Sequence, residues 1–281
     1  MKRLFEIIGL ATLMFFSIMI THKTEMVFEN VDNIMIEIKE KSEIYKQMEV
    51  DAKIDGDTII PGKYGRSVNI KKSYQQMKKY GAFKEEMLVY NLKKPKISLS
   101  DYKDKYIING YPKDRKISLI FKINNYEGNI DEVLKILDSD NIKATFFVDD
   151  EWFSEHNNLI NDLINQQHTI GLLSHNLDYQ DSSFGWMDTI IKSVTKQKQG
   201  YCYYTDKREN LDSFVLLNNY TIKPIEISEN LFYEVKKNLN NGVMLSFNLN
   251  KQLVHELKTI ISYINTKGYS LVSLENLLSE K

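Results

Sequence analysis

The run Ile117-Ser-Leu-Ile-Phe-Lys-Ile-Asn124 precedes a helical repeat at Val133–Leu137, which leads to a second apolar run, Ile142-Lys-Ala-Thr-Phe-Phe-Val148. Short apolar runs and amphipathic helices continue to alternate as far as Ser270–Val272. Strands that alternate with helices in this way form parallel βα units. We therefore predict an α/β fold with about seven strands, a number that fits a closed or nearly closed barrel better than a three-layer sandwich.

Three of the apolar runs support a more specific prediction. Ser118–Phe121, Ala144–Val148 and Val243–Phe247 are almost continuously apolar. Such strands need cover on both faces, which helices flanking a parallel sheet supply. We expect these three segments to be buried, mutually parallel strands of one barrel.

The overall composition is that of an ordinary globular protein. Of the 281 residues, 42% are hydrophobic and 27% are charged, which excludes a collagenous or wholly disordered chain. The formal net charge is −1, and we find no concentrated basic face, so a nucleic-acid partner is not expected. Cys202 is the single cysteine and cannot form an intrachain disulfide. No Gly-rich phosphate loop opens any expected helix, so nucleotide binding has no support.

The N-terminus carries an apolar stretch, Leu4–Thr21, in which Glu6 is the one charge. As a helix it would be about 27 Å long, close to the ~30 Å hydrocarbon core of a bilayer. Lys2 and Arg3 before the stretch and acidic residues after it favour a cytoplasmic N-terminus. Because no small-x-small cleavage site follows, we expect an uncleaved single-pass anchor over residues 1–24, with the rest of the chain outside the cytoplasm. A cleaved signal peptide and a buried helix of a soluble domain are the alternatives.

Two further parts separate this anchor from the barrel. Residues 25–50 are charged, with Ile and Met near helical spacing, and predict a short stalk helix. Residues 51–113 contain extended runs and one short amphipathic helix over 69–79, which predict a small α+β domain. The barrel domain takes residues 114–281.

The barrel segment resembles the polysaccharide deacetylase (NodB-homology) family. The resemblance rests on the two runs quoted first, on Gln167-His-Thr-Ile-Gly171, on Asn241-Gly-Val-Met-Leu-Ser-Phe-Asn248 and on Lys267-Gly-Tyr-Ser-Leu-Val-Ser273. It implies a distorted (β/α)7 barrel with its active site at the C-terminal ends of the strands. It also implies a hydrolase that removes acetyl groups from glycans. Such a site needs a divalent metal, usually zinc, held by a carboxylate and two histidines, a second carboxylate as base and a distal histidine as acid.

In this chain every one of those positions carries a different residue. The paired acids correspond to Lys122 and Ile123, the two metal histidines to Leu173 and Leu177, and the distal histidine to Asn248. An ammonium repels a divalent ion, aliphatic side chains donate no lone pair, and asparagine cannot transfer a proton near neutral pH. We therefore expect no catalytic residue, no bound zinc or other divalent metal, and no other cofactor.

Several neighbouring residues leave alternatives open. A one-residue gap would bring His175 to the second metal position, although it is more simply explained as a polar loop residue. The family's Arg-x-Pro-Tyr-Gly motif corresponds to Tyr201–Thr205, which retains neither Arg, Pro nor Gly, and Arg208 beyond it is more simply a helix-surface charge. His168 matches a strand-start histidine that the resemblance implies to be structural. The aromatic residues near these positions would either stack on sugars or pack in the barrel: Trp186, Tyr201, Tyr203 and Tyr204.

The first hypothesis for function is a membrane-anchored pseudo-deacetylase, a binding or scaffold module for a cell-wall glycan or an envelope protein. Lys122, Tyr203 and Asn248 would then supply polar contacts. The second is an active deacetylase with a displaced site, for which the remaining candidates are Asp149, Asp150, Glu151, His175, Asp178 and Asp181. The first three of these acids open a helix, which N-capping and the helix dipole also explain. The third is a structural partner protein in which residues 51–113 mediate assembly.

Overall fold

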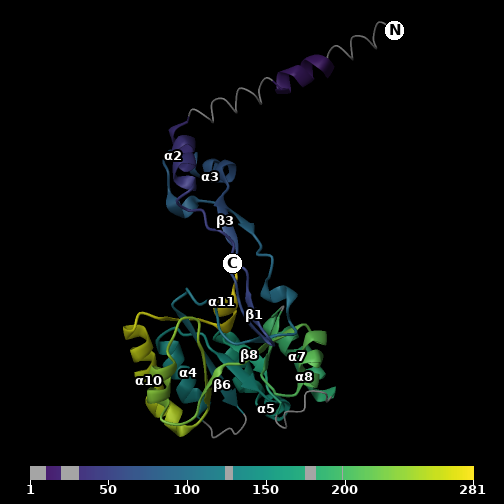
Figure 1. Ribbon diagram of the computed structural model, residues 1–281, viewed down its shortest axis with the longest axis vertical. Helices are drawn as coiled ribbons and strands as arrows, with labels where there is room; N and C mark the ends of the chain where they lie inside the picture. The colour runs from purple at the N-terminus through teal and green to yellow at the C-terminus, as the bar shows by residue number, and fades with distance from the viewer. Residues whose placement is uncertain (1–10, 20–31, 124–128, 175–181, 198) are drawn as a thin grey trace, which may run out of the picture. The chain divides into compact units, whose positions relative to one another are not determined.

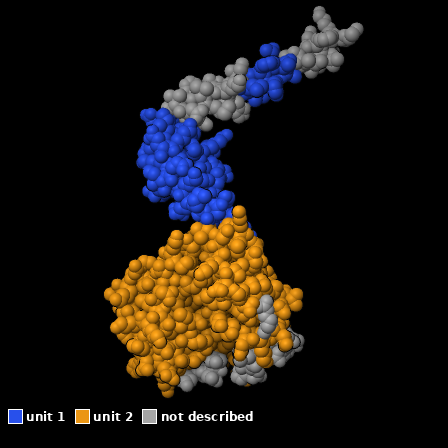
Figure 2. All heavy atoms as spheres, viewed as in Figure 1, with its two compact units in different colours: residues 1–49, 64–94 blue, residues 50–63, 95–281 orange. Residues whose placement is uncertain are grey.

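The computed structural model describes residues 11–19, 32–123, 129–174, 182–197 and 199–281. The chain divides into two compact units, residues 1–49 with 64–94 and residues 50–63 with 95–281 (Figures 1 and 2). This division differs from the expected domain boundaries, because both flanks of the 51–113 segment contribute strands to the main sheet. The part that remains separate is residues 64–94.

The larger unit is built on one sheet, in which the described residues form eleven strands in the order β1-β2-β5-β10-β9-β8-β7-β6-β12-β11, with β13 beside β6. The β1–β2 pair is antiparallel and the other pairs are parallel. The α/β fold class predicted from the sequence is confirmed. The strands are β1 (Lys53–Asp55), β2 (Thr58–Ile60), β5 (Tyr106–Ile107), β6 (Lys116–Ile123), β7 (Thr145–Val148), β8 (Thr169–Leu172), β9 (Gly200–Tyr203), β10 (Asn219–Ile222), β11 (Ile225–Ile227), β12 (Met244–Asn248) and β13 (Ser270–Leu271).

The three apolar runs singled out in the sequence are adjacent strands. β6 lies between β7 and β12 and is parallel to both. Phe121 pairs in register with Phe146 on one side and with Phe247 on the other, and all three side chains are fully buried. The prediction of buried, mutually parallel strands is therefore confirmed.

The sheet is curved but is not a closed ring of hydrogen-bonded strands. β10 pairs with β9, and β11 pairs with β12, while Lys223 and Pro224 alone separate β10 from β11. Proline has no N–H to donate to a strand ladder, so this segment bends there. The series β9-β8-β7-β6-β12 therefore has β10 paired to one end and β11 paired to the other. These two strands belong to one bent stretch of chain, residues 219–227.

Alternation along the strands separates two apolar clusters. In β6, Phe121 and Ile123 belong to the outer cluster, which is covered by the flanking helices, whereas Ile120 belongs to the inner cluster. Figure 1 shows α4 and α10 on one flank of the sheet and α7 and α8 on the other. The outer helices are α4 (Ile130–Ser139), α5 (Asp150–Glu155), α6 (Asn157–Asn165), α7 (Ser182–Thr195), α8 (Arg208–Leu216), α9 (Leu231–Asn238) and α10 (Lys251–Thr266).

The inner cluster is completed by α11 (Leu274–Leu278), whose leucines pack against Ile120 and Met244. Just beyond this helix, the carboxylate of Glu280 is buried and accepts hydrogen bonds from the backbone N–H groups of Gly62, at 3.1 Å, and Leu99, at 3.2 Å. The Ser98 hydroxyl donates to the same carboxylate. Because a carboxylate that accepts several N–H and O–H bonds is well satisfied, Glu280 fastens α11 to the segments that precede the barrel.

The smaller unit contains α2 (Asn33–Ser42), α3 (Ile70–Met77) and the antiparallel pair β3 (Gly65–Val68) and β4 (Tyr90–Lys93), with short 3-10 helices η1 (Glu85–Met87) here and η2 (Leu99–Asp101) in the larger unit. The helix expected near 69–79 is α3, and Asn69 caps it. The expected stalk helix is α2, but it is not a free stalk. Met35 and Ile38 are buried against Tyr74 and Met77, because α2 has an apolar face that α3 covers.

The expected anchor lies largely outside the described residues. Residues 11–19 are helical, and their apolar side chains, such as Phe15 at 62% exposure, lie open. Among the described residues, no helix has both the length and the apolar character needed to span a bilayer.

Candidate functional site

A cluster of four polar side chains lies toward the C-terminal ends of the parallel strands. Lys122 comes from β6, Tyr203 from β9, Glu226 from β11 and Ser246 from β12. These four residues are called the strand-end cluster below. The Lys122 ammonium lies 2.6 Å from a Glu226 carboxylate oxygen, so the two form a direct ion pair.

Strand alternation explains why Lys122 takes part in the cluster and Ile123 does not. Successive side chains of a strand point to opposite faces, so Lys122 lies on the same face as Ile120, toward the barrel interior. Ile123 has 1% exposure and lies in the outer cluster, among the helix-facing side chains. The position that the resemblance gives to a metal carboxylate is therefore buried away from the strand-end cluster.

The Tyr203 hydroxyl connects the other two members of the cluster. It donates to the Glu226 carboxylate, which can only accept, and shares a 2.7 Å hydrogen bond with the Ser246 hydroxyl. The Tyr203 ring has the Lys122 Nζ 5.2 Å from its centroid and the edge of Phe147 at 5.2 Å. The side chain of Lys122 is 14% exposed and that of Glu226 is 48% exposed, so the cluster reaches solvent mainly through the glutamate.

Two further predicted positions border the cluster. Leu173 directly follows β8, is buried and packs in the inner cluster beside Tyr203. Asn248 ends β12 opposite Lys122 in the ladder and is exposed. The remaining candidates, His175, Leu177, Asp178 and Asp181, lie outside the described residues.

The residues at the described positions do not fit a divalent cation. Lys122 offers an ammonium, and Ile123 and Leu173 offer no donor atom, whereas zinc requires N, O or S donors that converge on it. The Glu226 carboxylate is engaged by Lys122 and Tyr203. Within the ranges that the structure describes, no group of three or more His, Cys, Asp or Glu side chains is arranged to hold a metal ion.

The acids at the start of α5 have a structural role. The Asp149 carboxylate is buried and accepts a 2.8 Å hydrogen bond from the backbone N–H of Trp152, which makes it the N-cap of this helix. Asp150 and Glu151 occupy the first turn, where negative charge is favourable. Capping therefore accounts for the acidic run that the displaced-site hypothesis uses.

The aromatic residues are dispersed and do not form a common stacking surface. Tyr201 and Tyr203 are buried in the inner cluster, and burial raises the pKa of Tyr201 well above its usual range. Tyr204 lies in the outer cluster against Tyr106, with the ammonium of Lys223 4.2 Å from its ring centroid. Trp186 is 53% exposed on α7. Arg208 is the first residue of α8.

His168 is a buried structural residue, in agreement with the expectation from the sequence. Its Nδ1 accepts a 3.2 Å hydrogen bond from the backbone N–H of Ala144, which leaves the proton of the neutral ring on Nε2. Phe146 packs edge-on against the ring at 5.2 Å. Burial lowers the pKa of His168 to about 4, since desolvation penalises the charged imidazolium.

Glu226 and Ser246 are the members of the strand-end cluster that the sequence reasoning missed. A signal for Glu226 was present: it stands between Ile225 and Ile227 in an otherwise apolar strand. Its partner could not be identified from the sequence, because β11 reaches Lys122 only through its pairing with β12.

Comparison with known protein families finds a similarity over the strands that carry part of the strand-end cluster. The family model described as polysaccharide deacetylase matches residues 109–212, which include β6 to β9 and the strand-end residues Lys122 and Tyr203. The resemblance to the polysaccharide deacetylase family is therefore confirmed over residues 109–212. The match thus includes the substituted positions Lys122, Ile123 and Leu173, whereas β12 with Asn248 lies beyond it.

Relatives extend the similarity beyond that segment. Uncharacterized protein YlxY of Bacillus subtilis (strain 168) is 26% identical, over 92% of this chain and 87% of its own length. The structure of wild-type BA3943, a CE4 family pseudoenzyme from Bacillus anthracis, has a TM-score of 0.68 and 22% identity, over 89% of this chain and 96% of that one. Bacillus subtilis PdaA, a family 4 carbohydrate esterase, has a TM-score of 0.54 and 18% identity, over 64% of this chain and 86% of that one. These structural matches establish a shared fold.

Proposed function

We propose that this chain is a deacetylase-like protein without hydrolytic activity, which acts at the cell envelope as a glycan-binding or scaffold module. The observation that carries the proposal is the ion pair of Lys122 with Glu226. An ammonium stands where the resemblance requires a water-activating carboxylate, and the nearby carboxylate neutralises it. A water molecule at this position would find no free carboxylate base on β6 to accept its proton.

The known relatives support this direction. BA3943 is a CE4 family pseudoenzyme, and a mutant of it has restored enzymatic activity. The CE4 fold can therefore exist in a protein that does not perform the chemistry. For the present chain, the strand-end cluster supplies the physical reason, because its hydrogen bonds and charge pair are satisfied internally without a metal.

The same cluster would offer polar contacts to a bound glycan. Asn248 is exposed and can both donate to and accept from sugar hydroxyls. The carboxylate of Glu226, which is 48% exposed, can accept from hydroxyl groups, and Lys122 and Tyr203 hold it in position. A glycan would bind through hydrogen bonds at this surface rather than by stacking on Tyr203, whose ring is buried.

Attachment to the membrane is part of the proposal. Lys2 and Arg3 followed by the apolar stretch Leu4–Thr21 have the composition of an uncleaved anchor with an outward-facing C-terminal part. A reporter that is active only outside the cytoplasm, fused after residue 48, should give signal. Activity limited to a cytoplasmic reporter would contradict the proposed orientation.

The deciding experiment measures chemistry and binding on the same preparation. The purified soluble part, residues 25–281, is analysed for metal content and then incubated with an N-acetylglucosamine tetramer in the presence and absence of zinc. We expect no stoichiometric metal and no acetate release, together with calorimetric binding of the tetramer that Asn248→Ala weakens and Ser262→Ala, an exposed α10 control, does not. Stoichiometric zinc with acetate release would instead establish the alternative, an active metal-dependent deacetylase with an atypical site. Absence of both binding and hydrolysis would leave scaffolding by protein contacts as the remaining function.

A further inference from the structure

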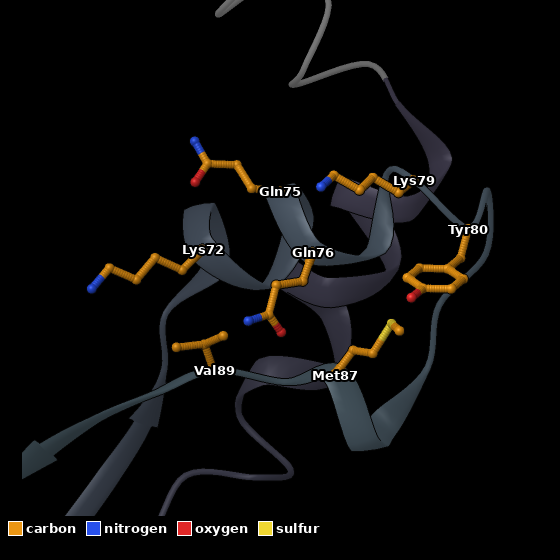
Figure 3. A pocket seen from close by; sticks show the side chains of 7 residues that line it. All are labelled: Lys72, Gln75, Gln76, Lys79, Tyr80, Met87 and Val89. Atoms are coloured by element: carbon orange, nitrogen blue, oxygen red, sulfur yellow. The ribbon is translucent and has the colours of Figure 1, made fainter.

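A groove of about 610 Å³ lies in the smaller unit, between α3 with the turn after it and the segment that leads into β4 (Figure 3). Its lining contains two lysines, two glutamines, one tyrosine and two apolar residues: Lys72, Gln75, Gln76, Lys79, Tyr80, Met87 and Val89. Figure 3 shows Gln76 directed toward the segment with Val89 and Met87, and Tyr80 standing beside Met87. The polysaccharide deacetylase family model does not cover this part of the chain, since its match begins at residue 109.

Helical spacing explains why these side chains lie together. The five lining residues from Lys72 to Tyr80 recur at intervals of three and four, which places them on one face. A separate face carries Tyr74 and Met77, which are buried in the core of the unit. The groove-facing side is thus not the side that stabilises the helix, and all five of its residues are exposed.

The charge of this region departs from that of the whole chain. Residues 64–94 contain eight Lys and Arg but two acidic residues, Glu85 and Glu86. The segment therefore carries a local basic excess, although the whole chain has a formal net charge of −1. Neither acid lines the groove. Glu85 instead accepts a hydrogen bond from Tyr45.

The mixture of groups indicates the chemistry of a ligand. Lys72 lies on α3 and Lys79 in the turn after it, seven residues further along the chain, and the two ammonium groups would attract separate anionic groups. The glutamine amides between them can donate to and accept from hydroxyl groups. The Tyr80 ring is 60% exposed and has the Lys84 ammonium 5.1 Å from its centroid on one face. Its other face and the thioether of Met87 would supply an apolar surface for a sugar. A simple anion would use the lysines alone and leave the amides and the ring without a role.

We infer that this groove binds an anionic saccharide, with acid groups on Lys72 and Lys79 and sugar hydroxyls on Gln75 and Gln76. The inference extends the proposed glycan-binding function but rests on different residues. Failure at the strand-end cluster would show in the Asn248 variant, and failure here would show in the α3 variants, so the two outcomes are distinguishable.

The probe is a hyaluronan tetrasaccharide, which carries a carboxylate in each disaccharide, and its carboxyl-reduced form is the neutral counterpart. Binding to the full chain is measured by calorimetry at two salt concentrations. We expect Lys72→Gln with Lys79→Gln to weaken binding roughly tenfold, because two exposed charge pairs with the probe are lost and each contributes modestly. Lys71→Gln with Lys78→Gln removes the same charge at the same spacing outside the groove lining and should change affinity less than about threefold.

A second variant tests the groove by a change other than the loss of lysine charges. Gln76→Glu is nearly isosteric and places a carboxylate inside the groove, so it should abolish binding of the acidic probe, whereas Gln76→Asn should retain most of it. Thermal melting checks that each variant is folded. Equal affinity for the carboxyl-reduced probe, equal losses in the Lys71 and Lys78 variant, or polyphosphate binding that the same variants lose in the same proportion would overturn the proposed saccharide site. Absence of any tetrasaccharide binding would overturn it as well.

Discussion

The ammonium group of Lys122 on β6 lies 2.6 Å from the carboxylate of Glu226 on β11, although 104 residues separate the two in sequence. Neither strand is the other's neighbour, since β12 lies between them. The ion pair therefore crosses over β12 on the inner side of the sheet. Tyr203 on β9 reaches the same carboxylate from the far side of the cluster. Charge and hydrogen bonding here join three strands that the ladder itself does not pair.

Substitution of Glu226 should destabilise the protein more than substitution of Lys122. Glu226→Gln leaves the ammonium of Lys122, 14% exposed, without its counter-charge, and we expect a loss of about 1–3 kcal/mol in the free energy of unfolding. Lys122→Met leaves a half-exposed carboxylate that water can solvate and should cost less. Urea unfolding of both single variants and the double variant forms a cycle. Additive losses would show that the two residues do not interact appreciably.

Restoring only the two carboxylates should not restore hydrolysis. Lys122→Asp with Ile123→Asp still leaves Leu173 without a donor atom, and Ile123 lies in the outer cluster with 1% exposure. An aspartate there would be a buried unpaired charge, so we expect a loss of several kcal/mol in stability and no acetate release with zinc. Lys122→Asp alone separates the two effects, because its side chain faces the inner side. Acetate release by the double variant would contradict this prediction.

Stability should fall between pH 7 and pH 5 because of His168. Its pKa is lowered by burial to about 4 in the folded state, whereas an unfolded histidine has a pKa near 6.5. The unfolded state therefore binds a proton first as the pH falls through this window, and stability is lost until the folded histidine titrates near pH 4. The expected loss by pH 5 is about 2 kcal/mol.

The matched variant for this measurement is His168→Asn. Its amide oxygen can accept from the Ala144 backbone N–H but does not titrate. Urea unfolding at pH 7 and pH 5 should give a smaller difference for the variant than for the unmodified chain. An equal difference would assign the pH dependence to other groups.

The carboxylate of Glu280 should be important for stability although it follows the last helix. Glu280→Ala removes the acceptor for the Gly62 and Leu99 N–H groups and leaves them buried without it, which we expect to cost about 2–3 kcal/mol. Glu275→Ala, on the exposed side of α11, is the control and should cost less than about 0.5 kcal/mol. Equal midpoints of thermal unfolding in the two variants would refute the assignment.

The strands and the outer helices could be predicted because local patterns determine them. The apolar runs of β6, β7 and β12 require two covered faces, and Asp149 before α5 has the character of an N-cap. The division of residues 51–113 between two units could not be predicted, because short strands such as β5 acquire their partners only in the folded sheet. The role of Glu226 could not be predicted for the same reason, since its contact with Lys122 depends on strand order rather than on sequence spacing.

The bent segment at Lys223 and Pro224 has a consequence for thermal motion. Covalent bonds close the sheet there, and covalent bonds do not open and reform as hydrogen bonds do. Fluctuations that part the strands must therefore occur elsewhere, and among the described residues β8 and β9 share one register pair, Leu172 with Cys202, the shortest ladder in the series from β9 to β12. Transient separation of strands should therefore be most frequent between β8 and β9, directly beside Leu173 and Tyr203. Amide hydrogen exchange should be fastest there.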